Sequence, residues 1–226
     1  MSNQTTNPTI EQYLISNCLL TIDELNMAYK NYSSEQIKDI ADKHFNEMDI
    51  TARVGYPFKQ MAHYTITEGK KKQTPKSNHD IYVESKDFKI EIKYLKNWRA
   101  SSGNYSSSKT WKEYQCDFDW LLEEIDNGNK GKVAFILGWF NCVSSFSQII
   151  QLGTGSGWKP LVNESRICYF PFLYRPQIPT YTSDLQYNYE IAYQNLQLTP
   201  AGHNKKKYNC MFLGNENDCF HFAVYF

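Results

Sequence analysis

One stretch carries more structural information than the rest of the chain: Asn78-His79-Asp80-Ile81-Tyr82-Val83-Glu84-Ser85-Lys86-Asp87-Phe88-Lys89-Ile90-Glu91-Ile92-Lys93. It predicts a β-hairpin, because residues 81–83 and 88–95 are rich in β-branched and aromatic side chains and a polar turn joins them. Strand side chains alternate between two faces, so Ile90 and Ile92 lie on one face and Glu91 and Lys93 on the other. A carboxylate and an ammonium therefore project together from an otherwise apolar strand.

The composition indicates a folded chain with an aromatic core. The 226 residues carry no net charge and are 41% hydrophobic, with 17 Tyr and 13 Phe, which excludes a disordered chain. No run reaches the roughly 18 apolar residues of a membrane span, and no signal peptide is recognisable. The six cysteines form no C-x-x-C pair. We therefore expect reduced thiols, a cytoplasmic protein and no membrane partner.

The zero net charge hides an uneven distribution. Residues 59–112 hold twelve Lys or Arg and five Asp or Glu, a surplus of seven positive charges around the hairpin. Residues 113–128 hold six acidic residues and no cation. The basic segment points to a polyanionic partner, although a solvated lysine-rich loop at 70–76 explains part of it equally well.

The first fifty residues have helical patterns. Thr9 and Thr21 each begin a capping box, followed three residues later by Gln12 and Glu24. A third helix is expected over 34–48, where apolar residues recur on one stripe, and Glu47 lies on its flank close to its end. We expect residues 1–33 to form a helical extension and 34–226 the main domain. These helices either read DNA as a helix-turn-helix or, more commonly, pack beside the sheet.

The rest of the chain alternates between strands and helices. A strand is expected at 62–67, and a mobile polar loop at 97–109. A capping box at Thr110 is expected to open a helix that Gly128 ends. The apolar run 132–140 predicts a strand buried on both faces, and further strands are expected at 166–174 and 220–226. The glycine-rich run 153–160 is interpreted as a turn, because it lacks the Ser or Thr of a phosphate-binding loop.

Asp80, Glu91 and Lys93 have the spacing D-x10-E-x-K. Two carboxylates can bind Mg²⁺, for which Mn²⁺ can substitute, and the ion can take a phosphate oxygen as a further ligand. It also activates water and offsets charge on phosphorus. A lysine on the same strand face can orient the attacking water and stabilise developing charge. The pattern is that of phosphodiester hydrolysis.

Together with their hairpin, these three residues resemble the PD-(D/E)xK nuclease superfamily, which includes many restriction endonucleases. The sequence departs from the family pattern at His79, where proline is usual. The resemblance implies an α/β fold, a restriction-endonuclease-like αβββαβ core at about 34–140 with a central mixed sheet of four to five strands. It also implies that the backbone carbonyl of Ile92 joins the metal ligands. Glu47 would contribute a further carboxylate from the preceding helix, and Gln115 a polar side chain from the following helix.

The function that the resemblance implies is a Mg²⁺-dependent endodeoxyribonuclease of the restriction or anti-phage kind. DNA is the expected partner, and a homodimer is an option because enzymes that cut both strands symmetrically often pair. Substrate contacts are expected at Lys96, Arg99, Lys109 and Gln115. Three alternatives remain: a nuclease toxin domain, a catalytically silent nucleic-acid-binding module, and a hairpin whose Glu91 and Lys93 form an ordinary surface pair.

Overall fold

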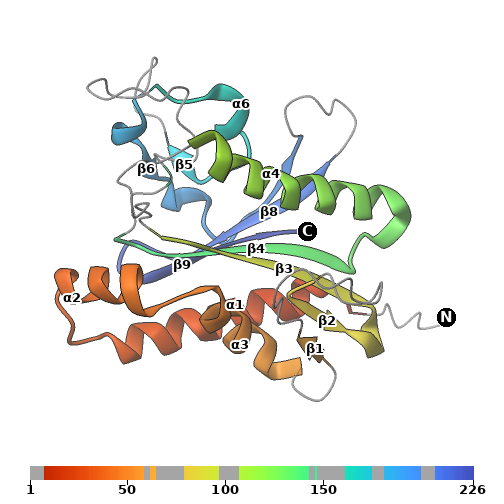
Figure 1. Cartoon of the computed structure of the whole chain (residues 1–226), viewed down its shortest axis with the longest axis horizontal. Helices are drawn as coiled ribbons and strands as arrows, with labels where there is room; N and C mark the ends of the chain where they lie inside the picture. The colour runs from red at the N-terminus through yellow and green to blue at the C-terminus, as the bar shows by residue number, and fades with distance from the viewer. Residues whose placement is uncertain are drawn as a thin grey trace.

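A mixed β-sheet with helices on both faces organises the computed structural model of the chain (Figure 1). The structure describes residues 8–58, 62–64, 79–96, 107–142, 146, 161–174, 181–199 and 207–226. Within these ranges, none of the helices is both long and apolar enough to span a bilayer. Several predicted segments lie outside the described residues: the basic loop at 69–78, the polar loop at 97–106, residues 147–152 and the glycine-rich run 153–160.

The main sheet has seven strands in the order β1-β2-β3-β4-β9-β8-β7. It contains β1 (Ala62–Tyr64), β2 (Ile81–Val83), β3 (Phe88–Leu95), β4 (Val133–Phe140), β7 (Asn195–Leu198), β8 (Tyr208–Leu213) and β9 (Phe220–Tyr225). Neighbouring strands are antiparallel except for β3 and β4, which are parallel. The expected hairpin is confirmed, with Ile81 paired to Ile90 and Val83 to Phe88. Asp87 takes a left-handed conformation, φ 55°, at its turn.

The parallel pair needs a crossover connection, which α4 (Ser107–Glu124) supplies. A π turn at Ile125–Asn129 follows the helix, and Gly128 has a φ of 88° there, as expected of a helix-ending glycine. The helix begins at Ser107, so Thr110 is an interior residue and not the predicted cap. Every residue of β4 is buried, which confirms the strand expected from its continuous apolar run.

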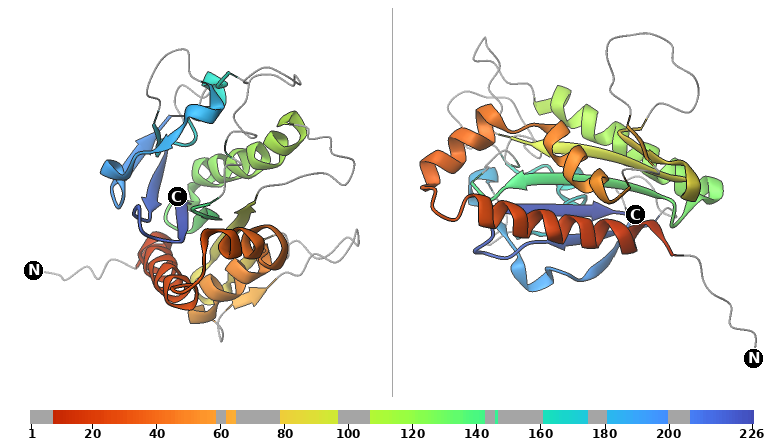
Figure 2. Two further views of the ribbon diagram at one scale, coloured as in Figure 1. Left: turned by 90° about the vertical axis from the view of Figure 1, so that its left-hand side faces the viewer. Right: turned by 90° about the horizontal axis from the view of Figure 1, so that it is seen from below.

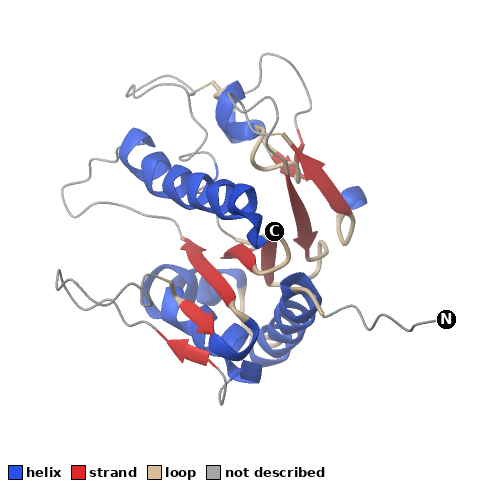
Figure 3. Ribbon diagram, turned by 90° about the vertical axis from the view of Figure 1, so that its right-hand side faces the viewer, coloured by secondary structure: helices blue, strands red, loops and turns tan. Residues whose placement is uncertain are grey.

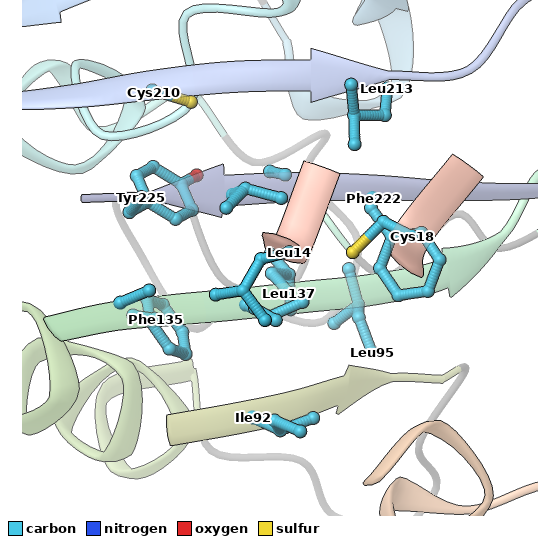
Figure 4. Packing of buried hydrophobic residues seen from close by; sticks show 14 of the residues in the cluster. Leu14, Cys18, Ile92, Leu95, Phe135, Leu137, Cys210, Leu213, Phe222 and Tyr225 are labelled. Carbon is cyan, nitrogen blue, oxygen red and sulfur yellow. The ribbon is translucent and has the colours of Figure 1, made fainter. Parts of the chain in front are cut away.

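Helices α1 (Ile10–Ala28) and α3 (Glu47–Gly55) cover one face of the sheet, and α4 covers the other (Figures 1 and 2). Leu14 and Cys18 of α1 lie over β4 and β9 (Figure 4). Both belong to the same buried cluster as the sheet residues. Gly138 of β4 permits this packing, since a Cβ there would lie 2.8 Å from Ile50 Cδ1 of α3.

Two predicted helix boundaries in this region are wrong. Thr21 begins no new helix; its hydroxyl donates back to the Asn17 carbonyl (2.8 Å), and α1 continues through it. The helix expected over 34–48 is divided into α2 (Ser34–Asp39), a π turn and α3. The division falls at Asn46, whose side chain accepts from the Met48 N–H (2.8 Å) while its own N–H donates to Asp49 (2.9 Å). Glu47 is thus in the first turn of a new helix.

The last third of the chain extends the sheet and covers the α4 side (Figure 3). The strand at 220–226 is confirmed as β9. The prediction of a strand at 166–174 is wrong, because α6 (Glu164–Ile167) occupies the first part of this range. Only Leu173–Tyr174 form a strand, β5, which pairs with β6 (Gln186–Tyr187). Asn163 caps α6 by accepting from Ser165 N–H (3.0 Å). Strands β7 and β8 were not expected from the sequence.

Candidate active site

The candidate site lies where β2 stops pairing with β3. The last paired residues are Ile81 and Ile90, although β3 runs on to Leu95. The Lys89 N–H points to the β4 side of the strand. Because successive N–H groups of a strand point to alternate sides, those of Ile92 and Tyr94 point to the opposite side, away from β4. Among the residues that the structure describes, none pairs with β3 beyond the Ile81–Ile90 pair on this side.

Two carboxylates take the places that carbonyl groups of a longer β2 would have filled. Asp80 Oδ2 accepts the Ile92 N–H at 2.7 Å. Glu47, at the start of α3, accepts the Tyr94 N–H from across the edge of the sheet. Backbone N–H and C=O groups of one strand residue point to the same side, so the Ile92 carbonyl faces this unpaired stretch too. The interrupted pairing therefore gathers Glu47, Asp80 and the Ile92 backbone at one edge.

On the α4 side of β3, three side chains form polar contacts with α4 and with His79. We call this row of Lys89, Glu91 and Lys93 with their partners the β3–α4 seam. Lys89 Nζ lies 2.7 Å from Glu124 Oε2, and Lys93 Nζ lies 3.7 Å from Asp117 Oδ2. Between these pairs, Glu91 Oε1 contacts His79 Nδ1 at 2.8 Å. Residues 117 and 124 share one helix face because they are seven apart, and 89, 91 and 93 share one strand face. The seam thus forms where this face of the β3 strand contacts this face of the α4 helix.

Lys93 lies between carboxylates of two helices. Its Nζ is 3.9 Å from Glu47 Oε2 and 3.7 Å from Asp117 Oδ2. Burial alone would lower the pKa of Lys93, but Glu47, Asp117, Asp80 and Glu91 together raise it. Lys93 is therefore an ammonium that carries positive charge.

The surroundings of the site's carboxyl groups disfavour their ionised forms. Burial raises the pKa of Asp117 to about 7, with the negative charges of Glu91 and Asp80 adding to it and Lys93 opposing it. Burial also raises the pKa of Glu47 and that of Glu91. The Asp117 side chain is only 17% exposed, and its buried Oδ2 has no hydrogen-bond partner among the described residues. Clustered, partly desolvated carboxylates of this kind are typical of functional sites.

This donor set fits a hard divalent cation. It consists of carboxylate oxygens and one strand carbonyl, which are the ligands that Mg²⁺ takes. A cation would neutralise acids whose raised pKa values record mutual repulsion and burial. In the part of the chain that the structure describes, no three acidic, imidazole or thiol groups converge on a single point at ligand distance. Asp80 and Glu47 are bonded to backbone N–H groups, and Glu91 to His79.

The residues expected to contact substrate have different outcomes. Gln115 is exposed on α4 and lies about 200° around the helix from Asp117, so it does not point at the acidic cluster. Lys96 is half-buried just beyond β3. Arg99 and the side chain of Lys109 lie outside the described residues. Substrate contacts at these positions stay predictions.

The structure changes the interpretation of the basic segment. Lys89 is paired with Glu124, and Lys86 Nζ lies 5.1 Å from the centre of the Tyr13 ring. Lys93 is enclosed by acids. These three of the twelve cations of the basic segment therefore interact with side chains of the same chain, and we do not count them toward the charge that would attract a partner.

Sequence reasoning missed Asp117 and the contact of His79. A signal was present for Asp117: it lies seven residues before Glu124, so both acids share one face of the helix, as Lys89 and Lys93 share one face of the strand. For His79 no signal existed, because its contact depends on how the chain bends before β2.

Comparisons of the chain with protein-family models, with curated proteins and with solved structures found no match.

Proposed function

We propose that this protein is a Mg²⁺-dependent endonuclease that hydrolyses phosphodiester bonds of DNA, with a restriction-endonuclease-like core and a role in restriction or anti-phage defence. One observation carries the proposal. Asp80 lies at the edge of β3 and interacts electrostatically with Glu91, which projects from β3 toward α4. Beside them, Lys93 Nζ lies 3.9 Å from Glu47 Oε2. The three residues of the D-x10-E-x-K pattern and the extra acid from the preceding helix are thus gathered in one place.

The order of the elements supports the proposal. Helix α3 precedes the antiparallel strands β1, β2 and β3, and α4 then crosses over to β4, which is parallel to β3. The resemblance implies an αβββαβ order, so this order of elements supports the proposed restriction-endonuclease-like core. The strands β7, β8 and β9 extend that sheet on its far side.

Each residue has a chemical role in the proposal. Asp80, Glu91, the Ile92 carbonyl and Glu47 would hold the metal ion, which when bound supplies positive charge to the reacting phosphate. Lys93, kept as an ammonium, would orient the attacking water and stabilise charge that develops on the phosphoryl oxygens. The buried carboxylate of Asp117 would fix the position of the Lys93 side chain from the α4 side.

Cleavage assays with plasmid DNA, single-stranded DNA and RNA, in Mg²⁺ and in chelator, test the proposal. We expect cleavage of DNA in Mg²⁺ only, and its loss in Asp80→Asn. Asp87→Asn is the matched control, because Asp87 lies in the turn of the same hairpin and its side chain is about half exposed, and because Asn accepts a left-handed conformation. This control should cleave like the wild type.

Two results would contradict the proposal in different ways. DNA binding without cleavage on any substrate would make the chain a silent binding module. RNA cleavage without DNA cleavage would replace the substrate. A toxin would instead be recognised by death of the expressing host in the absence of a protective partner.

A further inference from the structure

His79 and Glu91 form a short side-chain contact within the candidate site. Nδ1 of the imidazole lies 2.8 Å from Oε1 of the carboxylate. Their side chains are only 14% and 15% exposed. When Glu91 is ionised it can only accept, so the imidazole then donates its Nδ1–H. Glu91 thus has a fixed, largely dehydrated hydrogen-bond donor.

The imidazole is itself held in place by α4. Its ring centre lies 5.2 Å from that of Trp120, with an angle of 41° between the planes. Trp120 packs against the core from the helix face that also carries Asp117 and Glu124. The orientation of His79 is therefore set by a rigid element on the opposite side of the seam.

Three carboxylates at the site are each fixed by a different donor. Asp80 is held by the Ile92 N–H and Glu47 by the Tyr94 N–H, both of which belong to the β3 backbone. Glu91 extends toward α4, away from that edge, and a side chain supplies its donor. A hydrogen bond that occupies one carboxylate oxygen restricts rotation and leaves the second oxygen for another ligand.

We propose that His79 is a positioning residue, which holds the Glu91 carboxylate in the orientation needed to bind a divalent cation. This inference rests on the proposed function, since it assumes that Glu91 is a metal ligand. It assigns a role to the residue that stands where the family pattern has proline. A proline there has no side-chain donor, so in this chain the imidazole adds an orienting contact.

Metal binding by the free protein, measured calorimetrically with Mn²⁺ in the absence of DNA, tests the inference. We expect His79→Ala to weaken Mn²⁺ binding by roughly 10- to 100-fold, as is usual when the partner of a metal-ligating side chain is removed. His79→Asn should retain most of the affinity, since the amide can place an N–H near the position of Nδ1. His44→Ala is the control, because the His44 side chain is 67% exposed and pairs with Asp39 on the surface.

The Mg²⁺ dependence of cleavage provides a second measurement. In His79→Ala, the Mg²⁺ concentration for half-maximal cleavage should rise by a similar factor, and excess Mg²⁺ should restore much of the rate. Because a bound metal also stabilises the folded state, thermal unfolding curves of each variant without metal separate this effect from a loss of stability alone.

The failure of the inference can be distinguished from that of the proposed function. Wild-type protein that binds no Mn²⁺ and cleaves nothing would overturn both. Wild-type protein that binds Mn²⁺ through Glu91, with His79→Ala binding equally tightly, would overturn the role of His79 alone. Equal losses in folded His79→Ala and His79→Asn would also overturn it, because the hydrogen bond would then not be what matters.

Discussion

Two halves of one sheet face, both on the α4 side, differ completely in chemistry. On β3 this face carries Lys89, Glu91 and Lys93, which meet charged or polar side chains. On β4 the same face carries Phe135 and Trp139, and its neighbours are aromatic. The two strands are adjacent and in register, with Glu91 beside Phe135 and Lys93 beside Leu137.

The aromatic half is built for packing. Trp139 is fully buried, and its ring stacks on Phe172 and Phe212 with interplanar angles of 18° and 8°. His221 is a buried titratable side chain of this half. Burial lowers its pKa, although the hydrogen bond from Nε2 to the Asn215 carbonyl opposes this. His221 is therefore neutral, in contrast to the charged Lys93.

The difference shows what a buried charge requires. Lys93 keeps its charge because four carboxylates raise its pKa against the effect of burial. Those acids are available because β2 ends early and α4 crosses over β3. In the aromatic half, β9 continues the pairing along β4 from Phe135 to Phe140, and no open edge exists there. The candidate site lies where the pairing of β2 with β3 stops, and the aromatic core lies where the pairing of β4 with β9 continues.

Removal of the central ring of the aromatic half should have the largest effect. We expect Trp139→Ala to lower the free energy of unfolding by about 3–5 kcal/mol, through lost burial and the cavity that remains. Chemical denaturation followed by circular dichroism measures this change. Tyr174→Ala is the control, because Tyr174 is 51% exposed, and its loss should stay within about 0.5 kcal/mol. A loss in Trp139→Ala no larger than that of the control would contradict the role given to this half.

Removal of the charge from the polar half should act on chemistry instead. We expect Lys93→Ala to slow DNA cleavage by about 100- to 1000-fold, the cost of losing one group that stabilises developing charge, with DNA binding largely kept. Single-turnover cleavage and a filter-binding assay measure the two quantities.

Lys89→Ala is the matched control for Lys93, since it lies on the same strand face and is also paired with an acid of α4. It should leave the cleavage rate nearly unchanged while it reduces stability. Comparable cleavage by the Lys93 and Lys89 variants would show that the seam is only a structural ion-pair array.

The smallest of the three effects concerns Asp117, and it depends on pH. Its pKa is about 7 in the folded protein, above the ordinary value near 3.9, so the folded state holds a proton that the unfolded state releases. Stability from this group is present below about pH 4 and is lost as the pH rises to about 7. Asp117→Asn should therefore be more stable than the wild type by on the order of 2 kcal/mol at pH 8, and by little at pH 4.

Thermal or urea unfolding of both proteins across this pH range measures the difference. Asp119→Asn is the control, because Asp119 is an exposed residue of the same helix. Its effect should stay within about 0.5 kcal/mol and show no such trend. A stability difference for Asp117→Asn that is independent of pH would argue against the buried, proton-holding carboxylate.

Local patterns in the sequence predicted those parts of the fold that depend on local rules. The hairpin, the fully buried β4 and the C-terminal β9 all follow from side-chain alternation or continuous apolar runs. Errors came where two local signals compete. Thr21 has the capping pattern but lies within α1, and Asn46 interrupts an apolar stripe that otherwise suggests one helix. Strands β7 and β8 were missed because their pairing is long-range.

The candidate site divides in the same way. Asp80, Glu91 and Lys93 were predicted from spacing, and Glu47 from the resemblance; the structure brings all four together, while their role in metal binding stays a prediction. The substrate contact expected of Gln115 stays a prediction. Asp117 is the residue of α4 that meets Lys93, and residues two apart on a helix point in nearly opposite directions.

The sequence by itself determined which side chains share a strand or helix face, because that depends only on the periods of 2.0 and 3.6 residues. It placed Glu91 and Lys93 together and opposite Ile90 and Ile92. Only the tertiary structure decided which faces meet: α4 opposite β3, Glu47 across the unpaired edge, and His79 against Glu91. These contacts join residues 12 to 46 positions apart, and such contacts are set by packing of whole elements, which no local pattern specifies.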